Sequence, residues 1–166
     1  MDEPRWLDDT EMRAWRGLLT TNRLLFEQLG RELQEDAGLS AADYEVLVQL
    51  SEAPGRRLRM TELAFFSLSS KSRLSHQIAR LESAGWVRRE ACASDRRGAF
   101  AVLTDNGFAV LAAAAPGHVE AVRRHLFDQL SYDDIRNLAE ITRKVTAHLE
   151  QVVDRDRPVP LRESVS

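Results

Sequence analysis

The 166-residue sequence contains a single cysteine, few aromatic residues and no long hydrophobic run. The lone Cys92 cannot close an internal disulfide, which excludes a disulfide-stabilised scaffold and favours the reducing cytoplasm. No apolar run approaches the ~18 residues that a membrane-spanning helix needs, so we expect no membrane partner. The first twenty residues carry five acidic side chains, which is not the composition of a basic secretory leader.

The motifs of the common enzyme classes are also missing from the sequence. It has no glycine-rich phosphate loop, no nucleophile elbow and no HExxH zinc motif. His118 and His125 are seven residues apart, a spacing that lacks the paired ligands of a zinc site. With only eight glycines and five prolines, the chain is expected to be mostly helical. These features favour a binding protein without metal or cofactor over an enzyme.

Charge is distributed unevenly along the chain. The formal net charge is only −3, but residues 56–97 hold ten basic and four acidic side chains, a net charge of +6. The remaining residues hold 13 basic and 22 acidic side chains, a net charge of −9. A basic middle between acidic flanks indicates that one face of the protein meets a polyanion such as DNA. The alternative is a solvated surface without a charged partner.

Apolar spacing and capping residues predict the order of the elements. The strands Trp86–Glu90 and Ala99–Leu103 flank a polar tip at Ala93–Gly98, which predicts a β-hairpin. The apolar segment Phe108–Ala115 is expected to be buried, and Pro116 is expected to break or kink its helix. The other expected elements are helices over 7–36, after the cap Ser40, over 62–66 after the cap Thr61, from the cap Ser70 to Ala84, and from Ser131 to Val152, with a short strand at 57–59.

The two terminal helical regions carry apolar stripes that one small domain cannot cover. In the first helix the stripe includes Trp15, Leu18 and Phe26, and in the last it includes Ile135, Leu138 and Ile141. A second subunit is the natural cover, so we expect a homodimer built from the two ends of the chain.

The helix that follows Ser70 has the side chains of a DNA-reading helix. Leu74, Ile78 and Leu81 are expected to point inward, which leaves a face rich in hydrogen-bond donors. Arginine and lysine can pair with guanine edges, glutamine with adenine, and serine with bases or phosphate. A short helix and a tight turn precede this one, as in a helix-turn-helix. The predicted DNA-contacting residues of this helix are Ser70, Lys71, Ser72, Arg73, Ser75, His76, Gln77 and Arg80. An ordinary polar helix face is the alternative.

The tip of the predicted hairpin carries two adjacent arginines, Arg96 and Arg97, beside Asp95. Guanidinium groups at an exposed tip can enter a DNA minor groove, where the negative potential attracts them. Asp95 would oppose DNA binding unless it orients one of the arginines through a salt bridge. Taken alone, this segment also fits a turn with solvated charges.

Several motifs occur in one register over the middle of the chain. They are Met60-Thr61-Glu62-Leu63-Ala64, Ser70-Lys71-Ser72, Leu81-Glu82, Gly85-Trp86-Val87-Arg88-Arg89, Asp95-Arg96-Arg97 and Leu103-Thr104-Asp105-Asn106-Gly107. In this combination they resemble the MarR family of winged-helix transcriptional regulators. The turn between the two middle helices departs from the family pattern, with Ser67-Leu68 where many members have Leu-Gly.

The resemblance implies a mostly α (α+β) fold and a role for each segment. It implies a winged helix over about 40–103, dimerisation helices over about 7–36 and 104–153, and a single domain over 1–153; residues 154–166 are expected to form a disordered tail. The helix after Ser70 would be the recognition helix and Asp95–Gly98 the wing. By the same resemblance Arg97 would enter the minor groove, braced by Asp95. The implied function is a ligand-responsive repressor that binds a palindromic operator in double-stranded DNA as a homodimer.

Three further hypotheses concern ligands and partners. Trp15, Arg16 and Tyr44 are candidate residues for a pocket that takes a small aromatic or carboxylate effector, with core and surface positions as the alternative. Cys92, near Arg89 and Arg96, is a candidate oxidation sensor in a redox-responsive regulator. A winged helix can also serve purely as a protein-interaction module, in which case the basic segment would face an acidic protein.

Overall fold

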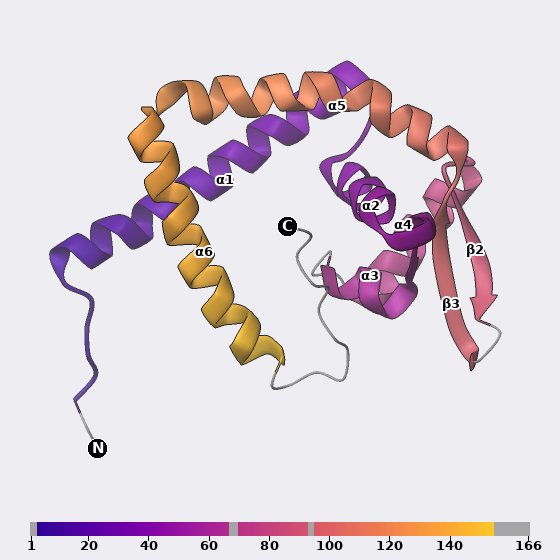
Figure 1. Ribbon diagram of the computed structural model, residues 1–166, viewed down its shortest axis with the longest axis horizontal. Helices are drawn as coiled ribbons and strands as arrows, with labels where there is room; N and C mark the ends of the chain where they lie inside the picture. The colour runs from indigo at the N-terminus through magenta and orange to yellow at the C-terminus, as the bar shows by residue number, and fades with distance from the viewer. Residues whose placement is uncertain (1–2, 67–69, 93–94, 155–166) are drawn as a thin grey trace.

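The computed structural model describes residues 3–66, 70–92 and 95–154 and shows a mostly helical chain with one small sheet. Figure 1 shows a compact lobe at one end, from which α1 and α5 extend side by side, while α6 turns back from the far end of α5. The helices are α1 (Asp9–Ala37), α2 (Ala41–Glu52), α3 (Met60–Phe66), α4 (Lys71–Ser83), α5 (Asp105–His125) and α6 (Tyr132–Asp154), and the strands are β1 (Arg57–Arg59), β2 (Val87–Cys92) and β3 (Asp95–Leu103). The predicted mostly helical fold class and order of elements are confirmed.

Capping side chains set the ends of the helices. Asp8 begins α1 with a capping box to Glu11, and Gly38 ends it in the left-handed conformation at φ 65°. The hydroxyls of Ser40 and Ser70 accept the backbone N–H three residues on, at 3.1 and 3.2 Å, as predicted for α2 and α4. At the start of α6, the side chains of Ser131 and Asp134 each accept the backbone N–H of the other residue, as in the capping box of α1.

The expected starts of α3 and β3 were wrong, and β2 ends at Cys92 rather than at Glu90. Thr61 does not cap α3, because the helix already begins at Met60 and the Glu62 carboxylate accepts the Arg59 N–H at 2.8 Å instead. β3 begins at Asp95 rather than Ala99, because a register shift after Ala91 lets Cys92 pair with Asp95 and extends the hairpin.

The sheet is antiparallel in the order β1-β3-β2. Leu58 lies opposite Ala101, and Val87 lies opposite Leu103. All four side chains are buried, so one face of the sheet closes the core of the lobe.

The core of the lobe fixes α4 against the other elements. Leu74, Ile78 and Leu81 of α4 are fully buried, as predicted, and pack in one cluster with Leu47 and Leu63. Burying a side chain of this size contributes ~1.5–3 kcal/mol. The orientation of α4 is therefore set by its apolar face, and the opposite face is left for other contacts.

The expected burial of Phe108–Ala115 holds only in part within the single chain, and Pro116 does not break the helix. Leu111 and Ala114 are buried, but Phe108, Ala112 and Ala113 are exposed within the single chain. The backbone of α5 continues through Pro116 as one helix, so the proline does not end it. One side of α5 packs on the lobe and on α1, and the other side remains uncovered.

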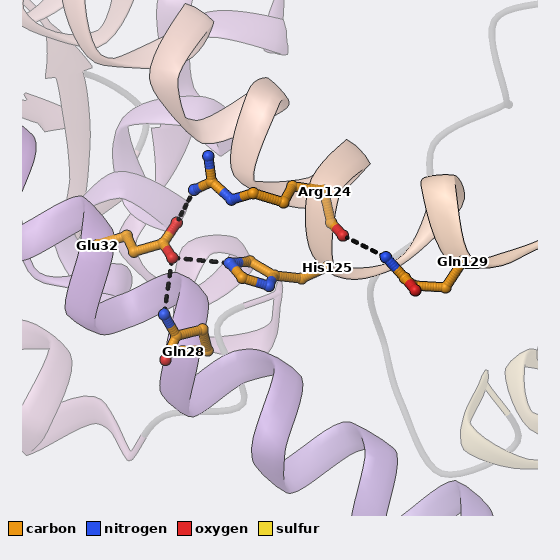
Figure 2. Close-up of polar contacts among 5 residues, drawn as sticks. All are labelled: Gln28, Glu32, Arg124, His125 and Gln129. Atoms are coloured by element: carbon orange, nitrogen blue, oxygen red, sulfur yellow. Dashed lines mark hydrogen bonds and ion pairs between the residues drawn. The ribbon is translucent and has the colours of Figure 1, made fainter.

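A polar cluster ties α1 to the last turn of α5 (Figure 2). Glu32 accepts hydrogen bonds from Gln28 at 2.7 Å and Arg124 at 2.8 Å, and its Oε1 lies 2.7 Å from Nε2 of His125. The bonds from Gln28 and His125, helped by the charge of Arg124, lower the pKa of the Glu32 carboxyl to about 2. The carboxylate therefore stays ionised and links the two helices that extend from the lobe.

Candidate nucleic-acid interface

The outward face of α4 presents hydrogen-bond donors to solvent. Ser72, Arg73, Ser75 and His76 are all exposed, in agreement with their predicted positions. Ser70 is also exposed, and its hydroxyl already accepts the Arg73 N–H as the helix cap. Within the described side chains, this face offers a guanidinium, an imidazole and three hydroxyls along less than three turns of helix. Such a set can bond both to base edges and to phosphate oxygens.

Gln77 does not belong to this face, so its prediction as an exposed DNA-contacting residue was wrong. Its side chain is only 8% exposed, and its Nε2 donates to Oδ1 of Asp43 at 3.2 Å. The residue lies at the edge between the apolar and polar faces of α4, where α2 covers it. Helical spacing alone could not show this, because the covering residue comes from a helix 34 residues away in sequence.

Arg80 is held by the same carboxylate. Its Nη2 lies 2.6 Å from Oδ1 of Asp43, while 63% of its side chain remains exposed. Asp43 itself is only 7% exposed. Asp43 was not predicted as a site residue, because a carboxylate three residues after Ser40 is explained by its place in the first turn of a helix.

The first strand of the hairpin is fastened to α4. The guanidinium of Arg89 donates to the Ser75 carbonyl at 2.8 Å and lies 3.7 Å from the Glu82 carboxylate. The same carboxylate accepts the Arg89 N–H at 3.0 Å. The first strand of the hairpin and α4 therefore pack directly against each other, and Figure 1 shows the hairpin at the edge of the same lobe.

Part of the predicted interface lies outside the described residues. The backbone of Lys71 is helical and that of Asp95, Arg96 and Arg97 is extended, but their side chains are not among those described. The turn residues Ser67 and Leu68 are outside the described part as well. The roles predicted for these side chains stay predictions.

Folding offsets some of the charge in the basic segment. Arg56 pairs with Asp105 at 3.2 Å, and Arg57 pairs with Glu90 at 3.8 Å. The guanidinium of Arg57 also lies 4.6 Å from the centre of the Phe100 ring. Glu90 is already counted in the net charge of +6, whereas Asp105 lies outside residues 56–97, so its pairing with Arg56 lowers the charge that this segment offers to a polyanion.

The three residues predicted to line an effector pocket are not brought together within one chain. Tyr44 is half-buried and packs on His118, with ring centres 4.6 Å apart, whereas Trp15 and Arg16 are exposed in the first half of α1. Leu29 follows Trp15 by fourteen positions, which is ~21 Å along the helix axis and separates Trp15 from the core. A different depression lies between α1 and α5; it is lined by Leu29, Glu32, Leu33, Asp36, Ala37, Ala113, Ala114, Gly117, His118 and Ala121.

The remaining candidates give no second site in the described part of the chain. Cys92 is buried at the end of β2, which is not the exposed position expected of an oxidation sensor. Among the residues that the structure describes, no group of three or more His, Cys, Asp or Glu side chains is placed to hold a metal ion. Over the same residues, no helix has the length and apolar character needed to cross a membrane.

Known proteins with the same architecture are transcriptional regulators. The crystal structure of AbsC from Streptomyces coelicolor, a MarR family regulator, is 51% identical and covers 89% of this chain and 99% of its own, with a TM-score of 0.80. The structure of Sco3205 from the same organism, a MarR family regulator in complex with DNA, is 52% identical over 90% of this chain and 94% of its own, with a TM-score of 0.82.

Sequence comparison agrees with the structural likeness. The transcriptional regulator HosA of Escherichia coli O127:H6 is 35% identical over 119 residues, which are 65% of this chain and 87% of HosA. The MarR family model matches residues 37–98, the segment that holds α2, α3, α4, β2 and the start of β3. Because these relatives are transcriptional regulators, the prediction of a regulator rather than an enzyme is confirmed. The chain belongs to the MarR family of winged-helix transcriptional regulators.

Proposed function

We propose that this protein is a homodimeric repressor that binds a palindromic operator in double-stranded DNA and is released by a small-molecule effector. The observation that carries the proposal is the donor-rich face of α4, exposed beside a hairpin that Arg89 fastens to it. A helix with this face fits the major groove of B-DNA, and the wing can reach the neighbouring minor groove. The DNA complex of Sco3205 supports this assignment by similarity.

The dimer is supported by apolar faces that the single chain leaves uncovered. On α1 the exposed side chains include Trp15, Leu18 and Phe26; on α6 they are Leu138, Ile141, Val145, Leu149 and Val152. The first part of α1 and the whole of α6 lie at the end of the molecule away from the winged-helix lobe (Figure 1). A second copy of the chain would cover both faces by two-fold symmetry. The terminal helices would then form the dimerisation lobe, and residues 40–103 the DNA-binding lobe.

Two-fold symmetry also sets the form of the operator. The two copies of α4 would enter successive major grooves, so the half-sites should lie ~10 bp apart. Occupation of such a site within a promoter would block transcription.

The effector would act at the depression between α1 and α5, where the extended helices join the lobe. His118 lies there with its Nδ1 buried and without a hydrogen-bond partner among the described residues. Burial lowers the pKa of His118, which favours the neutral ring. Because Glu32 and Asp36 also line the depression, their negative charge favours an effector that donates hydrogen bonds over a carboxylate. The ligand would relieve repression by favouring a dimer whose lobes no longer match the half-sites.

A gel-shift and salt titration with DNA flanking the gene of this protein tests the proposal. We expect a saturable shift that survives excess random DNA and a footprint of ~20 bp, about two turns of duplex. If that DNA is not bound selectively, selection of bound fragments from the whole genome locates a distant operator. Failure of both to yield any preferred sequence would overturn the proposal in favour of a protein-interaction module.

A further inference from the structure

We infer that Asp43 is a positioning residue for sequence reading: it aligns Arg80 and α4, so that it raises the preference for the operator over random DNA. The inference rests on the proposed DNA-binding function. It starts from an unusual arrangement, in which one buried carboxylate oxygen accepts hydrogen bonds from two side chains of the recognition helix.

The geometry makes Asp43 a clamp between two helices. Oδ1 accepts from Nε2 of Gln77 at 3.2 Å and from Nη2 of Arg80 at 2.6 Å. Gln77 and Arg80 are three residues apart, so they lie on the same side of α4. Asp43 is in the first turn of α2, where the helix dipole stabilises its negative charge. The carboxylate therefore holds one edge of α4 against the start of α2.

Because Asp43 is buried, its hydrogen bonds oppose any movement of α4 relative to α2. The Asp43 side chain is 10% exposed, and a buried carboxylate is stable only when it is paired and hydrogen-bonded. A shift of α4 relative to α2 would strip the carboxylate of its partners and leave its charge uncompensated. The apolar contacts of Leu74, Ile78 and Leu81 set which face of α4 is buried, and the hydrogen bonds of Asp43 add a fixed direction at its edge.

The Arg80 side chain contacts Asp43 at one nitrogen and solvent over the rest of its surface. Nη2 is engaged by Asp43, but most of the guanidinium side chain is exposed and retains donors for a phosphate oxygen. A guanidinium held by a carboxylate has lost rotamer freedom before DNA arrives, which lowers the entropic cost of the phosphate contact. Because phosphate contacts set the register of a protein on DNA, a fixed Arg80 would align Arg73 and its neighbours with the bases.

Loss of the Asp43 carboxylate should affect binding to random DNA and binding to the operator differently. Removing the negative charge of Asp43 should leave the affinity for random DNA unchanged or raise it, because repulsion of phosphate falls. It should weaken binding to the operator, because α4 and Arg80 are no longer aligned. A residue that merely stabilised the fold would weaken binding to both.

The experiment compares Asp43→Asn with the wild-type protein. The probes are a duplex that the wild-type protein has selected from a random-sequence pool and a random duplex of equal length. We expect the ratio of the two affinities to fall on the order of tenfold, the effect of one hydrogen bond to a charged group. Glu52→Gln is the matched control, because it removes the same charge from an exposed position on the same helix and should leave the ratio unchanged.

A double substitution tests the route through Arg80. If Asp43 acts through Arg80, adding Asp43→Asn to Arg80→Ala should lower the ratio much less than Asp43→Asn does alone. Should Asp43→Asn fail to fold, as judged by circular dichroism, Arg80→Lys carries the test: it keeps the charge but loses the planar fork, so only the operator affinity should fall. An unchanged ratio in the folded variant overturns the inference. If the wild-type protein selects no preferred sequence from the random pool, the proposed function itself is overturned.

Discussion

Gly107 and Trp86 meet backbone to backbone: a Cβ atom on Gly107 would lie 2.1 Å from the Trp86 carbonyl oxygen. The contact fixes the start of α5 on the first residues of the wing. Thr104 strengthens the same junction, since its hydroxyl donates to the Gly85 carbonyl at 2.7 Å and accepts the Gly107 N–H at 2.9 Å. The Leu-Thr-x-x-Gly motif thus joins the DNA-binding lobe to the helix that leads away from it.

Gly107→Ala is therefore expected to destabilise the protein by at least ~1–3 kcal/mol, the usual effect of overpacking against an immobile neighbour. The free energy of unfolding in urea measures this. Gly117→Ala is the control, because a Cβ there meets nothing within 4 Å and the helix should gain ~0.5–1 kcal/mol. Equal unfolding midpoints for the two variants would contradict the tight junction.

The predicted role of Arg97 in the minor groove is tested by Arg97→Ala. Loss of one cationic contact should weaken binding on most sequences and lower the salt slope of the affinity by about one. Salt titrations with an operator duplex and a random duplex measure both effects. Unchanged affinity together with an unchanged slope would show that the wing does not contact DNA through this side chain.

Arg73→Ala is expected to act on sequence preference instead. Arg73 is exposed near the start of α4, where it can pair with a base edge, and a lost pairing should cost ~1–3 kcal/mol of discrimination. Binding to single-base variants of the operator measures the loss. Gln77→Ala, in contrast, should change all positions together, because Gln77 contacts Asp43 rather than solvent. If Gln77→Ala lowered the sequence preference at one operator position only, Gln77 would contact a base there, which would contradict the burial of its side chain.

A charge placed in the uncovered face of α6 should disrupt the dimer. Val145 lies in the apolar repeat and is exposed in the single chain, so Val145→Asp would bury an unpaired carboxylate in the interface. Sedimentation should show monomers and loss of operator binding. Gln151→Asp, outside the repeat on the same helix, should leave the dimer intact. A dimeric Val145→Asp variant would place the interface elsewhere.

Glu32 predicts a pH dependence of stability. Its pKa is lowered from 4.5 to about 2 in the folded chain, so its stabilising effect is present above ~4.5 and is lost as the pH falls from 4.5 towards 2. Glu32→Gln should lower the free energy of unfolding at about pH 6 and much less at about pH 3. Glu35→Gln, at an exposed position of the same helix, is the control. A constant difference between wild type and Glu32→Gln across this range would contradict the role of the ionised carboxylate.

Local chemistry explains which parts of the fold could be predicted. The caps Ser40, Ser70 and Thr104 each bond to the backbone N–H three residues on, so their effect depends only on nearby positions in the sequence. The apolar repeat of α4 likewise predicted the burial of Leu74 and Ile78. The extent of β3 was not predicted, because it depends on a shift of strand pairing beyond Ala91 rather than on a local signal.

The candidate site divides in the same way. The sequence by itself determined the family through its motifs. It also determined most of the exposed donors of α4, because helical periodicity decides which side chains can share a face. Only the tertiary structure decided what happens at the edges of that face, where residues from distant elements meet. It buried Gln77 under α2, joined Arg80 to Asp43 and fastened Arg89 to α4. Such contacts depend on how helices pack against one another, and no spacing within a single helix encodes the position of its neighbour.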